Sequence, residues 1–321
     1  MASKRQLRSK IQSVKNIKQI TRAMQMVAAT KMRKSQDVAL GARPYAKNAL
    51  ALLSHIIQYK KNGDISFSSL EQPKESAKKV CLVVITSDKG LAGSFNGSVL
   101  RLSSNIFQEL RGKGEAVDIV AVGKKGKDFF AKRGSAPVAE FLKFSDIVQI
   151  HAIAPLSQWI LSAYEKGEYK KIIFCSMQFV SALVQKAETN EILPLNVEQL
   201  NKIVEGIIPK TGKYAELAKE QPASPADGSA SNHAVDYIFE PSREQIAEEL
   251  ARDLVRMEIA HLIFESNASE HSARMVAMKN ATDNAQNMQE TLTLALNKAR
   301  QAAITQEVAE ISTAKEALTS E

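Results

Sequence analysis

The last quarter of the chain is a segment of 80 residues, 242–321, that contains neither glycine nor proline. Apolar or small side chains recur through it at steps of three and four residues, which is the period of an amphipathic helix. An unbroken helix of that length would extend about 120 Å at 1.5 Å per residue. Since no globular domain needs such a helix, the sequence predicts an elongated element in addition to any compact domain.

The start and the seam of this helix can be read directly. Ser242 follows Pro241 and is the expected N-cap, and acidic side chains follow in the first turns, where the helix dipole favours negative charge. The predicted seam positions are Ile246, Leu250, Leu254, Met257, His261, Phe264, Ala268, His271, Met275, Met278, Thr282, Ala285, Met288, Leu292, Leu296, Ala299 and Ala303.

A second amphipathic helix is predicted over residues 3–40, with a continuation over 45–59 after an interruption at Gly41 and Pro44. Two long amphipathic helices at opposite ends of one chain cover each other's apolar stripes by packing side by side, antiparallel. The expected stripe of the first helix comprises Leu7, Ile11, Val14, Ile17, Ile20, Met24, Val27, Ala28 and Met32.

Between the two helices the period changes. Lys79–Thr86 (KVCLVVIT) is a continuous, β-branched apolar run of the kind that forms a buried parallel strand. Further strands are expected over 117–122, 138–141 and 171–175, alternating with helices over about 98–111, 124–133 and 146–166. Residues 178–210 suggest an added antiparallel hairpin, and the Pro/Gly/Ser/Ala-rich residues 211–235 suggest an inserted surface segment.

The predicted fold class is therefore α/β plus a long coiled coil. The N- and C-terminal segments form an antiparallel two-helix coiled coil, and the centre forms a Rossmann-like three-layer α/β domain. The expected boundaries are 1–60 for the N-terminal helix, 75–240 for the central domain with its insertion at about 211–235, and 241–321 for the C-terminal helix.

Charge is distributed unevenly along the chain. Residues 1–63 hold fourteen Lys or Arg against one acid, whereas 241–321 hold thirteen acids against eight Lys or Arg, so the two helical segments have complementary charge. A nucleic-acid-binding arm is the alternative for the basic segment, but residues 1–44 contain no aromatic side chain. A protein-facing or solvated helix surface is therefore favoured.

No run of eighteen apolar residues and no secretory signal is present, which argues against a membrane span. Cys81 and Cys175 lie in apolar β-like runs, which favours buried, reduced thiols and a cytosolic setting.

Candidate chemical sites are weak. Gly90–Gly93 follows a buried strand but lacks the spacing of a dinucleotide or P-loop motif, so a structural strand-to-helix turn is favoured over a phosphate site. Ser87 has no histidine near it in sequence that could activate it. The five histidines show no metal-ligand spacing: His55, His151, His233, His261 and His271. We expect no catalytic residue, no cofactor and no metal.

The segment Asn297–Glu310 (NKARQAAITQEVAE) combines Arg300, Gln301 and Thr305 with little apolar bulk. It is under-packed for a coiled-coil seam. From composition alone, a polar surface for a partner and plain solvent-facing surface are equally acceptable interpretations.

Five segments of the chain together resemble one family, the gamma subunit of the F-type, proton-translocating ATP synthase. They are Ile11–Arg33, Ile85–Asn96 (ITSDKGLAGSFN), Asp236–Pro241 (DYIFEP), Ser269–Asp283 and Asn297–Glu307. The resemblance runs in order to about Ile311, so the tail over 312–321 is unplaced. The chain lacks the cysteine pair of the chloroplast redox switch, and thiol regulation is not expected.

The resemblance implies a non-catalytic rotor, the central stalk, which transmits rotation between a proton-driven membrane ring and a catalytic ring. The implied partners are the alpha and beta subunits, the epsilon subunit and the membrane c-ring, with no nucleic acid. The implied location is peripheral, at the cytoplasmic face of the bacterial inner membrane. The residues implied to contact the catalytic ring are Met24, Lys31, Arg33, Arg274, Arg300, Gln301, Thr305 and Glu310, and those implied to contact the membrane ring are Tyr237 and Glu240.

Two other functions remain open at this point. One is a small α/β nucleotide-binding enzyme with a coiled-coil dimerisation arm, which requires a chemical site near Gly90–Asn96. The other is a coiled-coil scaffold that binds nucleic acid through residues 1–40.

Overall fold

The computed structural model describes residues 4–41, 70, 77–144, 147–195, 240 and 242–319. The chain divides into two compact units, one made of residues 1–29 and 274–321 and the other of residues 30–273. The two long helices, α1 (Lys4–Gly41) and α8 (Arg243–Thr319), each contribute to both units. Whether the chain divides at the boundaries expected from sequence remains a prediction.

The unit of residues 30–273 is built on a five-stranded sheet in the order β3-β2-β1-β4-β5. Its strands are β1 (Lys79–Ile85), β2 (Ala116–Val122), β3 (Ala139–Phe141), β4 (Tyr169–Phe179) and β5 (Gln185–Leu193). The first four are parallel to their neighbours, and β5 is antiparallel to β4. The mostly parallel sheet and the added antiparallel strand agree with the predicted α/β class.

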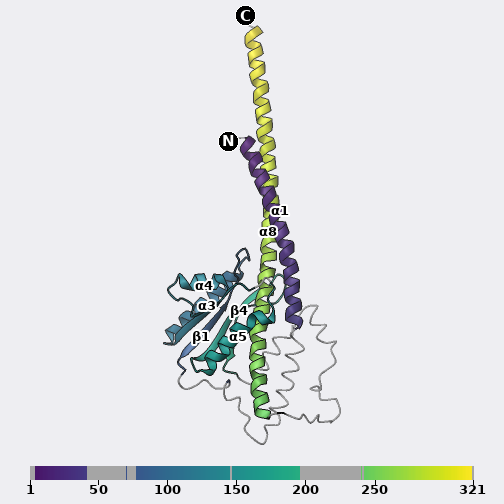
Figure 1. The fold of residues 1–321 in the computed structure, drawn as a ribbon. Coiled ribbons are helices and arrows are strands. Elements are labelled where there is room, and N and C mark those ends of the chain that lie inside the picture. Colours follow the sequence, from purple (N-terminus) through teal and green to yellow (C-terminus); the bar gives the residue numbers. More distant parts are fainter. Residues whose placement is uncertain are drawn as a thin grey trace. The chain divides into compact units, whose positions relative to one another are not determined.

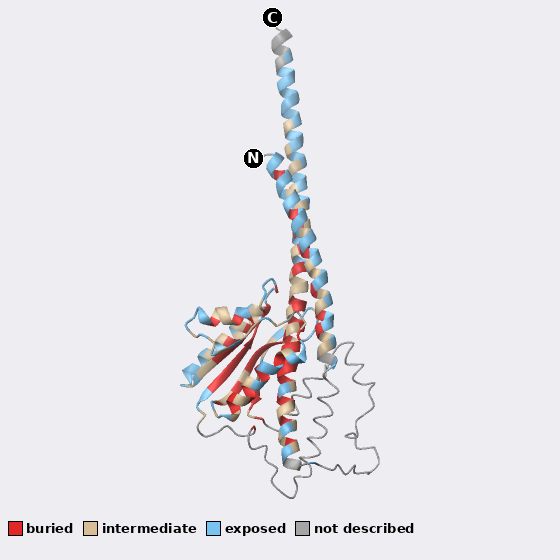
Figure 2. Ribbon diagram, viewed as in Figure 1, coloured by how far each residue is buried: buried red, intermediate tan, exposed pale blue. Residues whose placement is uncertain are grey.

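Helices cover both faces of this sheet, as Figure 1 shows. One face packs against α3 (Phe95–Gly112) and α4 (Lys124–Ala131), which contribute Phe95, Val99 and Phe130 to a buried cluster. The other face packs against α5 (Ile150–Glu165) and the first turns of α8. The central strands are buried on both faces, which explains their continuous apolar sequence (Figure 2).

The start of α8 agrees with the predicted cap, because the backbone N–H of Gln245 donates to Oγ of Ser242 at 3.2 Å. Within the same unit, Ala247, Ala251, Leu254 and Val255 of α8 are buried in the cluster that also contains α5. The end of α1 packs there too, since Ser35 Oγ donates to Oδ1 of Asn267 at 2.6 Å and Val38 contacts the core.

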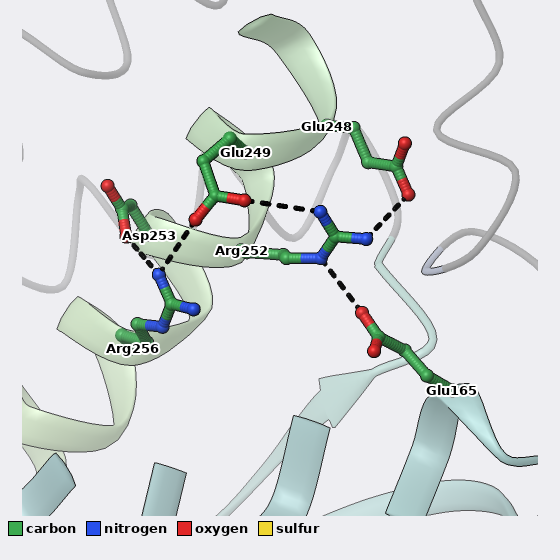
Figure 3. Close-up of polar contacts among 6 residues, drawn as sticks. All are labelled: Glu165, Glu248, Glu249, Arg252, Asp253 and Arg256. Carbon is green, nitrogen blue, oxygen red and sulfur yellow. Dashed lines mark hydrogen bonds and ion pairs between the residues drawn. The ribbon is translucent and has the colours of Figure 1, made fainter. Parts of the chain in front are cut away.

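An ion-pair network lies at the edge of this packing (Figure 3). Arg252 of α8 binds Glu165 at the end of α5 through Nε at 2.8 Å, and it also pairs with Glu248 and Glu249 of its own helix. Arg256 shares Glu249, and its hydrogen bond is the main cause that holds the pKa of the Glu249 carboxyl below its usual range. The guanidinium of Arg252, which is partly exposed and can form two parallel hydrogen bonds with a carboxylate, therefore joins α8 to α5.

The element bounds differ modestly from the expectations. The helix expected over about 98–111 begins at Phe95, and the helix expected over about 146–166 begins at Ile150. The strand expected over 171–175 extends from Tyr169 to Phe179, because its carboxyl half pairs with β5. The expected helix continuation over 45–59, the later part of the hairpin region and the insertion at 211–235 lie outside the described residues.

Candidate partner-contact surfaces

In the unit of residues 1–29 and 274–321, a heptad seam joins α1 and α8. The side chains that lose solvent recur at alternating steps of four and three on both helices, which is the pattern of a left-handed coiled coil. On α1 they are Leu7, Ile11, Val14, Lys18, Thr21, Gln25 and Ala28, and on α8 they are Met278, Thr282, Ala285, Gln289, Leu292, Leu296, Ala299 and Ala303.

Polar pairs lie within this seam. Thr282 Oγ1 is 2.8 Å from Thr21 Oγ1, and both residues are buried. One turn further along each helix, Lys18 Nζ donates to Oε1 of Gln286. The residue number falls on α1 as it rises on α8, so the pairing is antiparallel, as predicted. Buried polar pairs in a coiled coil fix the register of its helices.

The single stripe predicted on α1 is correct at Leu7, Val14, Ala28 and Met32 but wrong at three other positions. Ile17, Ile20 and Val27 are 52%, 58% and 52% exposed, and the seam residues that follow them in sequence are Lys18, Thr21 and Ala28. Ile17, Ile20 and Val27, together with half-buried Met24, form a second apolar stripe that is rotated by about 100° around the helix axis from the seam. The signal was present in the sequence, since Ile17, Ile20, Met24 and Val27 keep their own spacing of three, four and three.

The predicted seam position at Met288 is also wrong. Met288 is 57% exposed, and the neighbouring Gln289 occupies the seam. The steps of four and three through Thr282, Ala285 and Leu292 require a residue at 289. Apolarity alone therefore placed the seam one residue early at this point.

Beyond Ala303 the surface of α8 is exposed through Thr313. The exposed side chains include Ile304, Val308 and Ile311, at 47%, 57% and 69%. These three lie on the same helix face as Arg300, because steps of four, four and three return to nearly the same angle. An apolar stripe that ends in a guanidinium and faces solvent is typical of a protein-binding surface.

The other candidates on this helix point in different directions. Gln301 and Thr305 lie together beside the stripe, and Thr305 Oγ1 donates to the carbonyl of Gln301 at 3.0 Å. Glu310 lies on the opposite side from that pair, where its Oε1 accepts a hydrogen bond from Gln306 at 2.9 Å. The helix therefore presents two neighbouring polar positions next to Arg300, with Glu310 separate from them.

The remaining candidates are divided between the two units. Met24 and Arg274 are half-buried in the unit of residues 1–29 and 274–321. In the unit of residues 30–273, Lys31 is half-buried and Arg33 is exposed. Glu240 is exposed, and Tyr237 lies outside the described residues.

The turn after β1, where the enzyme alternative requires a nucleophile, is organised as structural support. Ser87 Oγ donates to the carbonyl of Lys89 at 2.5 Å and accepts from Nδ2 of Asn96 at 2.8 Å. Its backbone N–H donates to Oδ1 of Asn96 at 3.0 Å. These bonds close the loop between β1 and α3, and none of them joins Ser87 to a histidine, so the geometry favours the structural strand-to-helix turn.

Two of the described histidines lie on α8 and are buried, His261 at 7% and His271 at 2% exposure. His261 Nε2 lies 3.5 Å from Oε1 of Glu265 on the same helix. Among the residues that the structure describes, no three His, Cys, Asp or Glu side chains gather closely enough to hold a metal ion. Across the same residues, no helix is long and apolar enough to cross a membrane.

Both cysteines are buried and unpaired. Burial raises the pKa of the Cys175 thiol to about 12, and burial together with the nearby Asp118 raises that of Cys81 further. Such thiols are unreactive toward external reagents.

One buried carboxyl stands out in the same unit. Glu258 of α8 is 8% exposed, and its Oε2 has no hydrogen-bond partner among the described residues. Burial, with a smaller contribution from the charge of Glu265, raises the pKa of Glu258 to about 8.

Solved structures share this fold, a mostly parallel α/β domain together with a coiled coil of the two chain ends. A chain in the rotor of the Euglena gracilis mitochondrial ATP synthase shares this fold with a TM-score of 0.55 and 19% identity, over 94% of this chain and 98% of that one. A chain in the central stalk and c-ring of the Tetrahymena thermophila mitochondrial ATP synthase matches with a TM-score of 0.55 and 22% identity, over 82% and 99%.

Sequence comparison identifies the family. The family model described as ATP synthase matches residues 3–318. The ATP synthase gamma chain of Chloroflexus aurantiacus is 37% identical over 320 residues, covering all of both chains, and that of Roseiflexus sp. (strain RS-1) is 37% identical over 318 residues, covering 99% of each. The chain therefore belongs to the ATP synthase gamma-chain family.

Proposed function

We propose that this chain is the central-stalk rotor of a proton-translocating ATP synthase and that it carries no catalytic site of its own. Its coiled-coil end would turn inside a ring of alpha and beta subunits. Its α/β domain would be linked, with an epsilon subunit, to a membrane c-ring. The assembly would lie peripherally at the cytoplasmic face of a bacterial inner membrane.

The observation that carries the proposal is the exposed stripe of Arg300, Ile304, Val308 and Ile311 on α8. Apolar side chains that remain in water beyond the end of the seam favour a protein partner around that end. The second stripe on α1, with Ile17, Ile20 and Val27, extends the same argument to the opposite helix.

The physical mechanism needs stiffness and differential contact. α8 is continuous over 77 residues, and the paired threonines and the Lys18–Gln286 bond oppose sliding of the two helices. A stalk of this kind can carry torque without chemistry of its own. At each angle it would contact the surrounding subunits differently, and only such differences in contact free energy can shift the conformations of those subunits.

We assign the contacts residue by residue. Arg300, Gln301 and Thr305 would face a polar loop of the catalytic ring, with Glu310 on another side of the helix. Met24, Lys31, Arg33 and Arg274 would meet the ring around the lower part of the shaft, and Tyr237 and Glu240 would meet the membrane ring.

The test is a matched pair of substitutions on one helix. Arg300→Ala and Lys298→Ala each remove one exposed positive charge, but 298 and 300 lie on opposite helix faces. Arg300→Lys keeps the charge and loses the planar fork that can bind two acceptors. We expect Arg300→Ala and Arg300→Lys to lower coupled ATP turnover of the reconstituted complex at least several-fold, and Lys298→Ala to leave it unchanged.

The measurement is steady-state turnover of the assembled complex beside thermal melting of the free chain. Alanine is an excellent helix former, so neither alanine variant should unfold the helix. Equal turnover in all variants, or a loss that merely follows melting, would show that Arg300 is ordinary surface.

A further inference from the structure

A cavity of about 520 Å³ lies in the α/β unit. Its volume falls within the range of about 300–1,000 Å³ that is usual for small-molecule sites. The lining residues are Asp88, Lys89, Lys124, Lys127, Asp128, Leu142, Lys143 and Phe144.

The cavity is formed where three neighbouring parallel strands end. Lys89 follows β1, Lys124 and Lys127 lie in the first turn of α4 after β2, and Lys143 follows β3. Because these strands are adjacent and parallel, their following loops meet at the carboxyl edge of the sheet. Open α/β sheets bind their ligands at this edge.

Asp88 holds two of these loops in place. Its Oδ1 accepts the backbone N–H of Lys124 at 2.8 Å, and its Oδ2 accepts the backbone N–H of Lys143 at 2.9 Å. Lys143 has a φ of +62°, which is uncommon for a residue with a side chain. Such conformations persist where the surrounding structure imposes them, and they concentrate at ligand sites.

The balance of charge in the cavity is positive, with four lysines against two aspartates. Lys127 is paired with Glu140 at 2.6 Å, and the Asp88 carboxylate is engaged by backbone N–H groups. Lys124 and Lys143 are exposed and have no ion pair with any residue that the structure describes. Two ammonium groups on separate loops are thus available to one anion.

The helix start itself contributes little to anion binding. The N–H of Lys124 donates to Asp88, and the N–H of Gly126 donates to Oγ1 of Thr86 at 2.8 Å. An anion in the cavity must therefore be held by side-chain ammonium groups. The rest of the wall is formed by half-buried Asp128 and by two apolar residues, half-buried Leu142 and Phe144, which packs against the core.

We propose that this cavity binds a nucleoside polyphosphate. The phosphates would contact Lys124 and Lys143, with Lys89 beside them, and the base would lie against Leu142 and Phe144. Inorganic phosphate would fill only a small part of the volume and would leave the apolar wall in water. An acidic protein segment fits less well, because the lysines surround a hollow formed by three short loops. The proposal does not depend on the rotor function.

The test measures binding of ATP, tripolyphosphate, adenosine, inorganic phosphate and hexaglutamate to the full-length chain by titration calorimetry, in EDTA at low and moderate salt. The variants are Lys124→Ala and Lys143→Asn, since asparagine tolerates the left-handed backbone at 143. Lys113→Ala is the control, because Lys113 is an exposed lysine at the opposite end of α3. Leu142→Ala tests the apolar wall.

We expect ATP to bind, and each lysine variant to weaken its binding about fivefold, as for a partly exposed charge pair. Lys113→Ala should not change it, and added salt should weaken it. Leu142→Ala should weaken ATP binding and leave tripolyphosphate binding unchanged.

Four results would overturn the proposal. They are no ATP binding at millimolar concentration, no effect of Lys124→Ala and Lys143→Asn, tripolyphosphate binding as tight as that of ATP, and hexaglutamate binding as tight as that of ATP. The last result would assign the surface to an acidic protein segment instead.

Discussion

The buried carboxyl of Glu258 makes the stability of the α/β unit depend on pH in a direction opposite to that of most carboxyls. Its Oε2 has no hydrogen-bond partner among the described residues, and burial with the charge of Glu265 raises the pKa of Glu258 to about 8. In the unfolded chain the value is near the ordinary 4.5. Between these two pKa values the folded state binds more protons than the unfolded state, so the free energy of unfolding falls as pH rises.

The size of the effect follows from the shift. Each pH unit inside the window between 4.5 and 8 is equivalent to about 1.4 kcal/mol. From pH 5 to pH 7.5 the native protein should therefore lose about 3 kcal/mol through this group alone. Glu258→Gln has nearly the same shape and does not titrate, so it should not show this loss.

The assay is urea unfolding of the native protein and Glu258→Gln at pH 5, 6, 7 and 7.5. The difference in unfolding free energy between the two proteins removes the contribution of every other titrating group that they share. It should favour the glutamine variant increasingly as pH rises. Glu168→Gln, at an exposed position, should show no such trend. A difference that stays constant from pH 5 to pH 7.5 would refute the assigned burial and pKa of Glu258.

Three further changes test the packing. Gly123→Ala should cost more than about 2 kcal/mol of stability, because a Cβ there would lie 2.1 Å from the carbonyl oxygen of Thr86. Gly134→Ala, at a similar positive φ but with open space around it, should cost about 1 kcal/mol. Equal losses of stability in chemical denaturation would contradict the clash at Gly123. Thr282→Val should lower the stability by about 1 kcal/mol, because it removes the hydrogen bond to Thr21. In thermal melting, the double variant with Thr21→Val should lose less stability than the sum of the two single variants, and strict additivity would argue against the pair. Arg252→Ala should lower stability by about 1 kcal/mol at low salt and by less at high salt, and a loss independent of salt would show that its ion pairs with Glu165, Glu248 and Glu249 contribute little.

The sequence was most informative where one force dominates. The strand over Lys79–Thr86 is predicted correctly because a continuous β-branched run has few alternatives to a buried strand, and β1 ends at Ile85. The long helix is predicted correctly because 80 residues contain neither glycine nor proline. Its N-cap at Ser242 could be recognised in the sequence because serine is a preferred residue at that position.

The sequence does not show which side chains are buried where a helix carries more apolar residues than one coiled-coil seam can bury. Ile17, Ile20 and Val27 are as apolar as Val14, but only the heptad spacing shared with α8 decides which side chains are buried. Met288 was assigned to the seam for the same reason. These errors are useful, since side chains that match the seam in chemistry but stay exposed mark surface available to a partner.

The lysine-lined cavity could not be predicted because its residues come from three separate loops. Gly123-Lys124-Lys125-Gly126-Lys127 after β2 was a possible signal, but the contribution of Lys143 depends on the order of the strands and on the bond from its N–H to Asp88. Long-range pairing of this kind is not encoded in any local pattern.

The most direct test of the rotor proposal is to observe rotation of this chain within its assembled complex. A probe can be attached through Lys113→Cys, because that position is exposed and burial raises the pKa of both native cysteine thiols. With the catalytic ring fixed to a surface and ATP supplied, we predict continuous rotation of the probe in one direction, which stops when ATP is removed. A probe that remains stationary while the same complexes hydrolyse ATP would contradict the proposal that this chain is the rotor.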